Sequence, residues 1–169
     1  MRWLALLVLV ACAARPSERI FPPLPGALAQ VEAAPDLDGR PIGAQADARA
    51  TIVIVLASWC GHCHDEIAVI DKLRAAHPHL RVVGVNYKEH EEYDHRGSPA
   101  AIRAYSTAHA WLRIAPADQT LFDALGAPPM IPAMFVYGHD GALAAHYDRR
   151  GGAMPDAAEL AAVLSRLGA

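Results

Sequence analysis

The sequence has few of the residues that mark several large classes of protein. Its 169 residues include only three cysteines, and aromatic residues make up 7%. The net charge is −3, and basic residues form no stripe, which argues against nucleic acid as a main partner. Because aromatics are scarce, the core must consist mainly of Ala, Val, Leu and Ile. The length is enough for one domain with a substantial core.

Histidine, in contrast, is frequent, with nine residues. No two of them have the H-x-x-x-H spacing of a helical metal-binding pair, and the sequence predicts no metal site of its own. Only His62 and His64 adjoin two of the cysteines. We expect His64, His139 and His146 to be plain surface residues.

The N-terminus accounts for the odd cysteine, Cys12. An apolar run over residues 3–11 is too short to span a bilayer and has the length of the apolar region of a signal peptide. Leu9-Val-Ala-Cys12 resembles a bacterial lipobox, which implies cleavage before Cys12 and lipid on that residue. The alternative is ordinary cleavage after Ala13, since Ala11-Cys12-Ala13 also fits the A-x-A pattern. Both cases place the mature protein outside the cytoplasm, in an oxidising compartment.

The rest of the chain divides into a tether and one folded domain. We expect a signal peptide over residues 1–11, a lipidated tether rich in Pro and Ala over 12–35, and the domain over 36–169. Segment 51–57, T-I-V-I-V-L-A, is a β-branched run typical of a strand buried on both faces. A helical pattern follows the C-x-x-C motif and ends before Pro78. With a second buried strand over 80–87, these segments predict a βαβ unit.

Capping and turn residues predict the remaining elements. Ser98-Pro99 fits an N-cap followed by proline at the first helical position, which opens a helix to Ala108. The other predicted elements are a hairpin turn at Asp38-Gly39, an exposed polar loop over 88–97, a short helix over 118–125, a strand over 133–137 that turns at 139–141 into a second strand over 142–147, and an amphipathic helix over 155–167.

Residues 58–64, S-W-C-G-H-C-H, carry the candidate chemistry. A thiolate attacks disulfides, and the unpaired N–H groups at a helix N-terminus favour a negative sulfur. We therefore predict that Cys60 is the attacking thiol and Cys63 the resolving thiol. Protonated His62 would stabilise the Cys60 thiolate and make the disulfide a better oxidant. Trp59 is expected to cover one side of the pair.

Other interpretations of the two cysteines remain open. A zinc site would need further ligands, and the sequence holds no second C-x-x-C. A purely structural bridge across so short a loop would stabilise the fold little. A metal-handling module could hold Cu(I) between Cys60, Cys63 and a nearby histidine. A redox-inert binding domain is a third possibility.

The motif W-C-G-H-C between a buried strand and a helix resembles the thioredoxin superfamily. Ile131-Pro132 before the strand A-M-F-V-Y resembles the cis-proline loop of that family. The wider pattern is similar to TlpA-like extracytoplasmic thiol–disulfide oxidoreductases: Glu66 completes W-C-x-x-C-x-x-E, a helical insert lies at 98–108, and F-V-x-x-x-D-G spans 135–141. The resemblance implies an α/β thioredoxin-like fold with a central mixed β-sheet flanked by helices.

The resemblance also implies a function. The protein would be a membrane-tethered oxidoreductase on the periplasmic side of a bacterial membrane, with no cofactor beyond the Cys60–Cys63 pair. It would exchange that disulfide with protein substrates that carry cysteine pairs, and a membrane or periplasmic partner would donate or accept electrons. The TlpA-like pattern favours a reductant, for instance in cytochrome maturation. Ile131 and Pro132 would offer backbone groups to the substrate chain.

Three departures from the family pattern concern residues that affect proton transfer and the reduction potential of the Cys60–Cys63 pair. Ile54 stands where thioredoxins carry a buried Asp, so Glu66 is the predicted proton carrier. Ala68 replaces a helix-kinking proline. The middle dipeptide, Gly61-His62, is that of protein disulfide isomerase rather than the Gly-Pro of thioredoxin, which favours a more oxidising role. The direction of electron flow therefore stays open.

Overall fold

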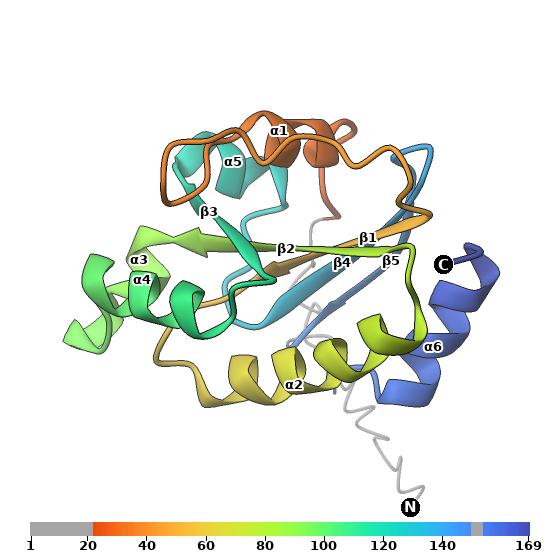
Figure 1. The fold of residues 1–169 in the computed structure, drawn as a ribbon. Helices are drawn as coiled ribbons and strands as arrows, with labels where there is room; N and C mark the ends of the chain where they lie inside the picture. The colour runs from red at the N-terminus through yellow and green to blue at the C-terminus, as the bar shows by residue number, and fades with distance from the viewer. Residues whose placement is uncertain (1–21, 150–153) are drawn as a thin grey trace, which may run out of the picture.

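A five-stranded mixed sheet forms the centre of the fold in the computed structural model, which describes residues 22–149 and 154–169 (Figure 1). The strand order is β3-β2-β1-β4-β5. β1 pairs with β2 and β2 with β3 in parallel, whereas β4 is antiparallel to both β1 and β5. The strands are β1 (Ala50–Val55), β2 (Leu80–Tyr87), β3 (Arg113–Ala117), β4 (Ala133–Gly138) and β5 (Leu143–Asp148).

Helices cover both faces of this sheet. One hydrophobic core lies between the sheet and helices α2, α4 and α6, and a second lies between the opposite face and helices α1 and α5 (Figure 1). No helix in the described ranges is long and apolar enough to cross a membrane. The helices are α1 (Ala27–Ala33), α2 (Gly61–Ala76), α3 (Lys88–Glu91), α4 (Pro99–Ala108), α5 (Gln119–Ala124) and α6 (Ala157–Arg166), with a 3₁₀ turn at Tyr93–His95.

The central strand β1 shows why the predicted βαβ unit forms. All six of its residues are buried. Ile52 and Ile54 enter the core under α2, while Val53 and Val55 enter the core under α1. A β-branched strand with two apolar faces requires a helical layer on each side. The unit β1-α2-β2 is present as predicted, and it delivers the C-x-x-C motif to the carboxyl edge of the sheet.

The helix of the predicted insert is also present. In α4, the Ser98 hydroxyl accepts a hydrogen bond from the N–H of Ala101 at 3.1 Å, and Pro99 occupies the first helical position. The predicted segments 118–125, 133–147 and 155–167 correspond to α5, the β4–β5 hairpin and α6.

The predicted tether over 12–35 is wrong in its C-terminal part. Residues 27–33 form α1, whose Ala27, Leu28 and Val31 are buried against the sheet. The N–H of Leu24 donates to the carbonyl of Ala124 at 2.8 Å. The folded part therefore begins before residue 36, because three apolar side chains of α1 enter the core. The predicted signal peptide and Cys12 lie outside the described residues.

Two local predictions also need correction. Asp38-Gly39 forms a turn, with Gly39 at φ 82°, but only an isolated bridge joins Pro35 and Pro41 beside it, so no hairpin strands form. The segment 88–97 is not a plain exposed loop, because it contains α3 and the 3₁₀ turn. Glu91 at the end of α3 is only 2% exposed.

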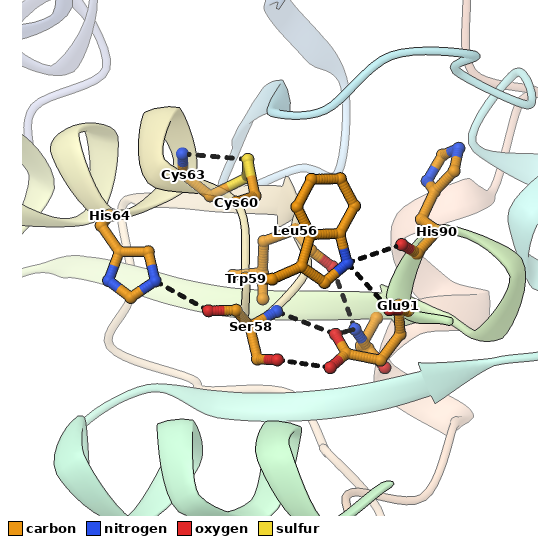
Figure 2. Close-up of a disulfide and its surroundings, with 9 residues drawn as sticks. Leu56, Ser58, Trp59, Cys60, Cys63, His64, His90 and Glu91 are labelled. Atoms are coloured by element: carbon orange, nitrogen blue, oxygen red, sulfur yellow. Dashed lines mark hydrogen bonds between the residues drawn. A yellow bond between two sulfur atoms is a disulfide. The ribbon is translucent and has the colours of Figure 1, made fainter. Parts of the chain in front are cut away.

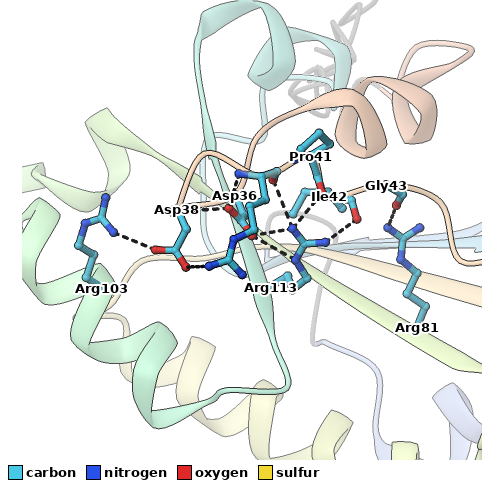
Figure 3. Close-up of polar contacts among 9 residues, drawn as sticks. Asp36, Asp38, Pro41, Ile42, Gly43, Arg81, Arg103 and Arg113 are labelled. Carbon is cyan, nitrogen blue, oxygen red and sulfur yellow. Dashed lines mark hydrogen bonds and ion pairs between the residues drawn. The ribbon is translucent and has the colours of Figure 1, made fainter.

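The segment between α1 and β1 is held to the sheet by two arginines (Figure 3). Arg113 on β3 donates to the Asp36 carboxylate at 2.6 and 3.2 Å and to the carbonyl of Ile42 at 2.7 Å. Arg81 on β2 pairs with Glu32 at 2.7 Å and donates to the carbonyl of Gly43. The Arg113 guanidinium, together with backbone N–H donors, lowers the pKa of Asp36 to about 2.

Candidate active site

Cys60 and Cys63 form a disulfide where β1 passes into α2. Cys60 is the N-cap of α2, and its sulfur accepts a hydrogen bond from the N–H of Cys63 at 3.2 Å. Both residues are buried, with 4% of Cys60 and none of Cys63 exposed. The sulfur of Cys60 therefore lies against the unpaired N–H groups of a helix start, which stabilise a negative charge.

The loop with Ile131 and Pro132 lies at the same edge of the sheet as the disulfide. The peptide bond between them is cis, as the resemblance led us to expect. Ala133, the next residue, pairs with Val55 at the end of β1, five residues before Cys60. Pro132 is buried, and Ile131 packs against both hydrophobic cores.

A buried carboxyl group holds the loop that leads into Cys60 (Figure 2). Glu91 accepts hydrogen bonds from the Ser58 N–H at 2.8 Å and from the Ser58 hydroxyl. It also accepts from the amide of Asn86 at 2.9 Å and from the N–H of Ser98 at 3.2 Å. The same Asn86 amide donates to the carbonyl of Leu56 at 3.1 Å. The end of β1, the end of β2 and the start of α4 thus meet at one carboxyl group.

Trp59 is fixed through its indole nitrogen. The indole N–H donates to the carbonyls of Glu91 at 2.8 Å and His90 at 3.0 Å. Tyr93 stacks on the indole with ring centroids 6.2 Å apart, and the guanidinium of Arg96 lies 5.2 Å from its centroid. The predicted cover of the sulfur pair is therefore held in place by residues of the segment that follows β2.

The two histidines of the motif have different surroundings. His62 is exposed in the first turn of α2. His64 is also exposed, but its Nε2 lies 2.8 Å from the carbonyl oxygen of Ser58 (Figure 2). Its ring also packs in a T-shaped arrangement with the ring of Tyr105. His64 therefore lies at the surface as expected, but it also bonds to the loop before Cys60.

Glu66, one turn after Cys63, is half-buried, and its Oε2 has no hydrogen-bond partner among the described residues. Burial raises the pKa of Glu66, the negative charge of Asp65 raises it further, and Arg149 lowers it. A carboxyl group with a raised pKa one helical turn from a thiol pair suits proton transfer. Gly61, between the cysteine and histidine, is the first residue of α2.

Solved structures share this architecture, whereas no family model and no curated protein matches the chain. A secreted disulfide oxidoreductase of Mycobacterium tuberculosis, described as homologous to E. coli DsbE, has a TM-score of 0.60 and 20% identity over 79% of this chain and 93% of its own. A thiol:disulfide interchange protein of Chlorobium tepidum has a TM-score of 0.60 and 16% identity over 89% and 98%. The exposed lipoprotein thioredoxin of Streptococcus pneumoniae has a TM-score of 0.58 and 14% identity over 79% of this chain and 96% of its own. The fold of this chain is thioredoxin-like.

The thioredoxin-like fold brings most of the predicted site together. One strand-to-helix junction holds Trp59, Cys60, Cys63 and Glu66. Pro132 lies at the same edge of the sheet. The described ranges contain no group of three or more His, Cys, Asp or Glu that could hold a metal ion. The copper interpretation therefore gains no third ligand from that part of the chain.

Sequence reasoning missed the contacts of Glu91, Asn86 and His64 within this thioredoxin-like site. Glu91 belongs to the polar run K-E-H-E-E, in which every glutamate suggests an exposed residue. Its burial depends on donors from three separate segments. The one signal in the sequence was the pair Asn86 and Ser58, polar residues near the carboxyl ends of two buried strands.

Proposed function

We propose that this protein is a thiol–disulfide oxidoreductase that exchanges the Cys60–Cys63 disulfide with cysteine pairs of other proteins. The observation that carries the proposal is the disulfide at the N-terminus of α2, with Cys60 as the N-cap. Structures with the same fold include a disulfide oxidoreductase and a thiol:disulfide interchange protein. The Ile131–Pro132 loop at the same edge of the sheet supplies a second feature that suits binding of an extended substrate chain.

In the reductive direction, the Cys60 thiolate attacks one sulfur of a substrate disulfide. A bond forms between the two sulfurs, and the other substrate sulfur leaves as a thiolate. Cys63 then gives its proton to Glu66, and its sulfur attacks that of Cys60, which breaks the bond between Cys60 and the substrate. The substrate leaves with two more electrons and becomes a dithiol by taking one proton from Glu66 and one from water, and Cys60–Cys63 is left oxidised. A dithiol partner in the same compartment must then reduce the pair.

Trapping of intermediates tests this assignment. Cys63→Ser should accumulate mixed disulfides with substrate proteins, because no resolving thiol is left. Cys60→Ser should accumulate almost none, since Cys63 is fully buried. Non-reducing gels followed by mass spectrometry measure both. The opposite pattern would exchange the two roles, and no adduct with either variant would argue against disulfide exchange altogether.

The reductive direction is part of the proposal. It is supported by the resemblance to TlpA-like proteins through Glu66, while His62 favours a more oxidising pair. A membrane or periplasmic electron donor would complete the cycle. Equilibration with glutathione buffers gives the potential of the pair, which decides between the two directions.

We also propose that Cys12 carries a lipid anchor that keeps the domain on the periplasmic side of a membrane. The support is the Leu9-Val-Ala-Cys12 pattern after an apolar run. Cys12→Ser should move the protein to the soluble fraction or block its processing. Unchanged membrane association, with no acyl mass at the mature N-terminus, would exclude the anchor.

A further inference from the structure

The carboxyl group of Glu91 occupies an unusual position, because it is buried and all its partners are donors. It accepts four hydrogen bonds: two from Ser58, one from Asn86 and one from Ser98. Within residues 22–149 and 154–169, no cation forms a salt bridge with it. Burying a carboxyl group costs free energy unless hydrogen bonds replace its water. The role of Glu91 therefore follows from the contacts that its hydrogen bonds make.

The contacts of Glu91 converge on the two residues that precede Cys60. Its carboxyl group takes both donors of Ser58, and its backbone carbonyl takes the indole N–H of Trp59 at 2.8 Å. The remaining polar atom of Ser58, its carbonyl oxygen, lies 2.8 Å from Nε2 of His64 (Figure 2). Every polar group of Ser58 is thus fixed, two residues before the attacking sulfur.

The chain also closes tightly around this carboxyl group. A Cβ atom on Gly97 would overlap both the side chain and the carbonyl oxygen of Glu91. The turn after α3 therefore depends on glycine at position 97 to bring Ser98 into hydrogen-bond reach. The segment from α3 to α4 thereby encloses Glu91 and presents it to the active-site loop.

We propose that Glu91 is a positioning residue that, through Ser58 and Trp59, holds Cys60 at the N-terminus of α2 and so increases the reactivity of its thiolate. This inference rests on the proposed exchange of the Cys60–Cys63 disulfide. A displacement of about 1 Å in a reacting group can lower a rate about a hundredfold. The hydrogen bonds to Ser58 restrain that kind of displacement.

Positioning and simple charge predict opposite results when Glu91 is replaced. A nearby negative charge disfavours a thiolate, so its removal alone would let Cys60 ionise at lower pH. Loss of positioning would move the sulfur away from the N–H groups of α2, so Cys60 would ionise at higher pH. The pH dependence of Cys60 alkylation therefore separates the two effects.

Glu91→Gln keeps the size of the side chain but breaks the pattern of acceptors. One carboxyl oxygen faces Ser58 N–H and Asn86, and the other faces the Ser58 hydroxyl and Ser98 N–H. In either orientation, the new NH₂ group meets a backbone N–H donor. Glu92→Gln is the matched control, because it removes the same charge from an exposed neighbour that pairs only loosely with Lys88 at 3.8 Å.

The test uses the full chain after reduction. Alkylation of Cys60 by iodoacetamide is followed across pH by mass spectrometry, and kcat and KM are measured with a synthetic peptide that carries an internal disulfide. For Glu91→Gln we expect the alkylation midpoint to rise by about one pH unit and kcat to fall about tenfold, with KM nearly unchanged. Glu92→Gln should match the wild type in all three. A midpoint that stays or falls in Glu91→Gln overturns the positioning role.

Ser58→Ala serves if Glu91→Gln does not fold, since it removes one of the four hydrogen bonds and no charge. The alkylation midpoint should again rise, by a smaller amount, and no rise would overturn the inference. Wild-type protein that leaves the peptide disulfide unreduced would contradict the proposed function instead. The alkylation profile would still decide the role of Glu91, so the two failures are distinguishable.

Discussion

Among single residues, Glu66 carries a prediction that depends on pH. As the proposed acceptor of the Cys63 proton, it works only when deprotonated, and burial raises its pKa. The resolving step should therefore slow as pH falls through this raised pKa. Glu66→Gln should be slow at all pH values and lack this dependence. Stopped-flow measurement of exchange with a peptide disulfide gives the profile.

Asp65→Asn provides the control for Glu66. The negative charge of Asp65 contributes to the raised pKa, so its removal should move the acid limb of the profile to lower pH and leave the plateau rate unchanged. An identical acid limb in the wild type and Glu66→Gln would assign the proton transfer to another group.

His62 sets a second residue-level prediction, on the reduction potential. A positive charge near Cys60 stabilises the thiolate and hence the reduced state, so the wild-type potential should be less negative than about −270 mV. His62→Pro should make it more negative. Equilibration with glutathione buffers measures both proteins. A wild-type value at or below about −270 mV that His62→Pro does not change would show that this exposed side chain has no part in tuning.

The sequence predicted the positions of Cys60 and Cys63 but not the residues that hold them. The cysteines are recognisable because a strand, a C-x-x-C motif and a helix follow one another along the chain. Glu91 and His64 act on Ser58 across 33 and six residues of sequence, respectively. Such contacts depend on how β2 and α3 pack, and the polarity of a side chain alone does not reveal them.

Among the helices and strands, those with strong local patterns were predicted, and those shaped by their neighbours were not. β1 has a continuous β-branched run, and α4 has an N-cap with a following proline. β3 escaped prediction because Pro116 interrupts R-I-A-P-A. It lies at the edge of the sheet, where a missing N–H is tolerated. Helix α1 is short, and only its contacts with the sheet and α5 mark it as part of the domain.

The role of α1 as part of the folded domain can be measured. Leu28→Ala should lower the free energy of unfolding by about 2–4 kcal/mol, because Leu28 is buried in the core between α1 and the sheet. Gln30→Ala, at an exposed position of the same helix, should change it by less than about 0.5 kcal/mol. Urea unfolding compares them. Equal stability of Leu28→Ala and the wild type would show that α1 is not part of the folded domain and belongs to the tether.

For the whole molecule, the ion pair of Asp36 and Arg113 predicts how stability depends on pH. The pKa of Asp36 falls from 3.8 to about 2 in the folded state. A lowered pKa contributes stability that is complete above the unfolded value and is lost as pH falls towards the folded value. Asp36→Asn should therefore reduce Tm at neutral pH and change Tm little at about pH 2. Asp47→Asn, at an exposed position, is the control, and an equal Tm difference at both pH values would contradict the prediction.

The fold class of the whole chain followed from a few segments, whereas its extent did not. One buried strand, the C-x-x-C helix and the cis-proline loop together indicated a thioredoxin-like sheet with helices on both faces. The start of the domain was misplaced because the Pro-rich stretch before Asp36 resembles a linker in composition. Arg81 and Arg113 hold the segment after α1 to the sheet, and both arginines lie on strands that are distant from this segment in sequence.

The close approach of Gly97 to Glu91 has a consequence for divergence among related proteins. The space that a Cβ atom at position 97 would need is occupied by the side chain and carbonyl of residue 91. Glycine should therefore persist at 97 in every relative that keeps this turn, because the carbonyl stays in place whichever side chain stands at 91. Where the carboxylate at 91 is lost, Ser58 should lose its own constraint in the same lineages. Such linked substitutions would trace when this way of holding the attacking cysteine arose.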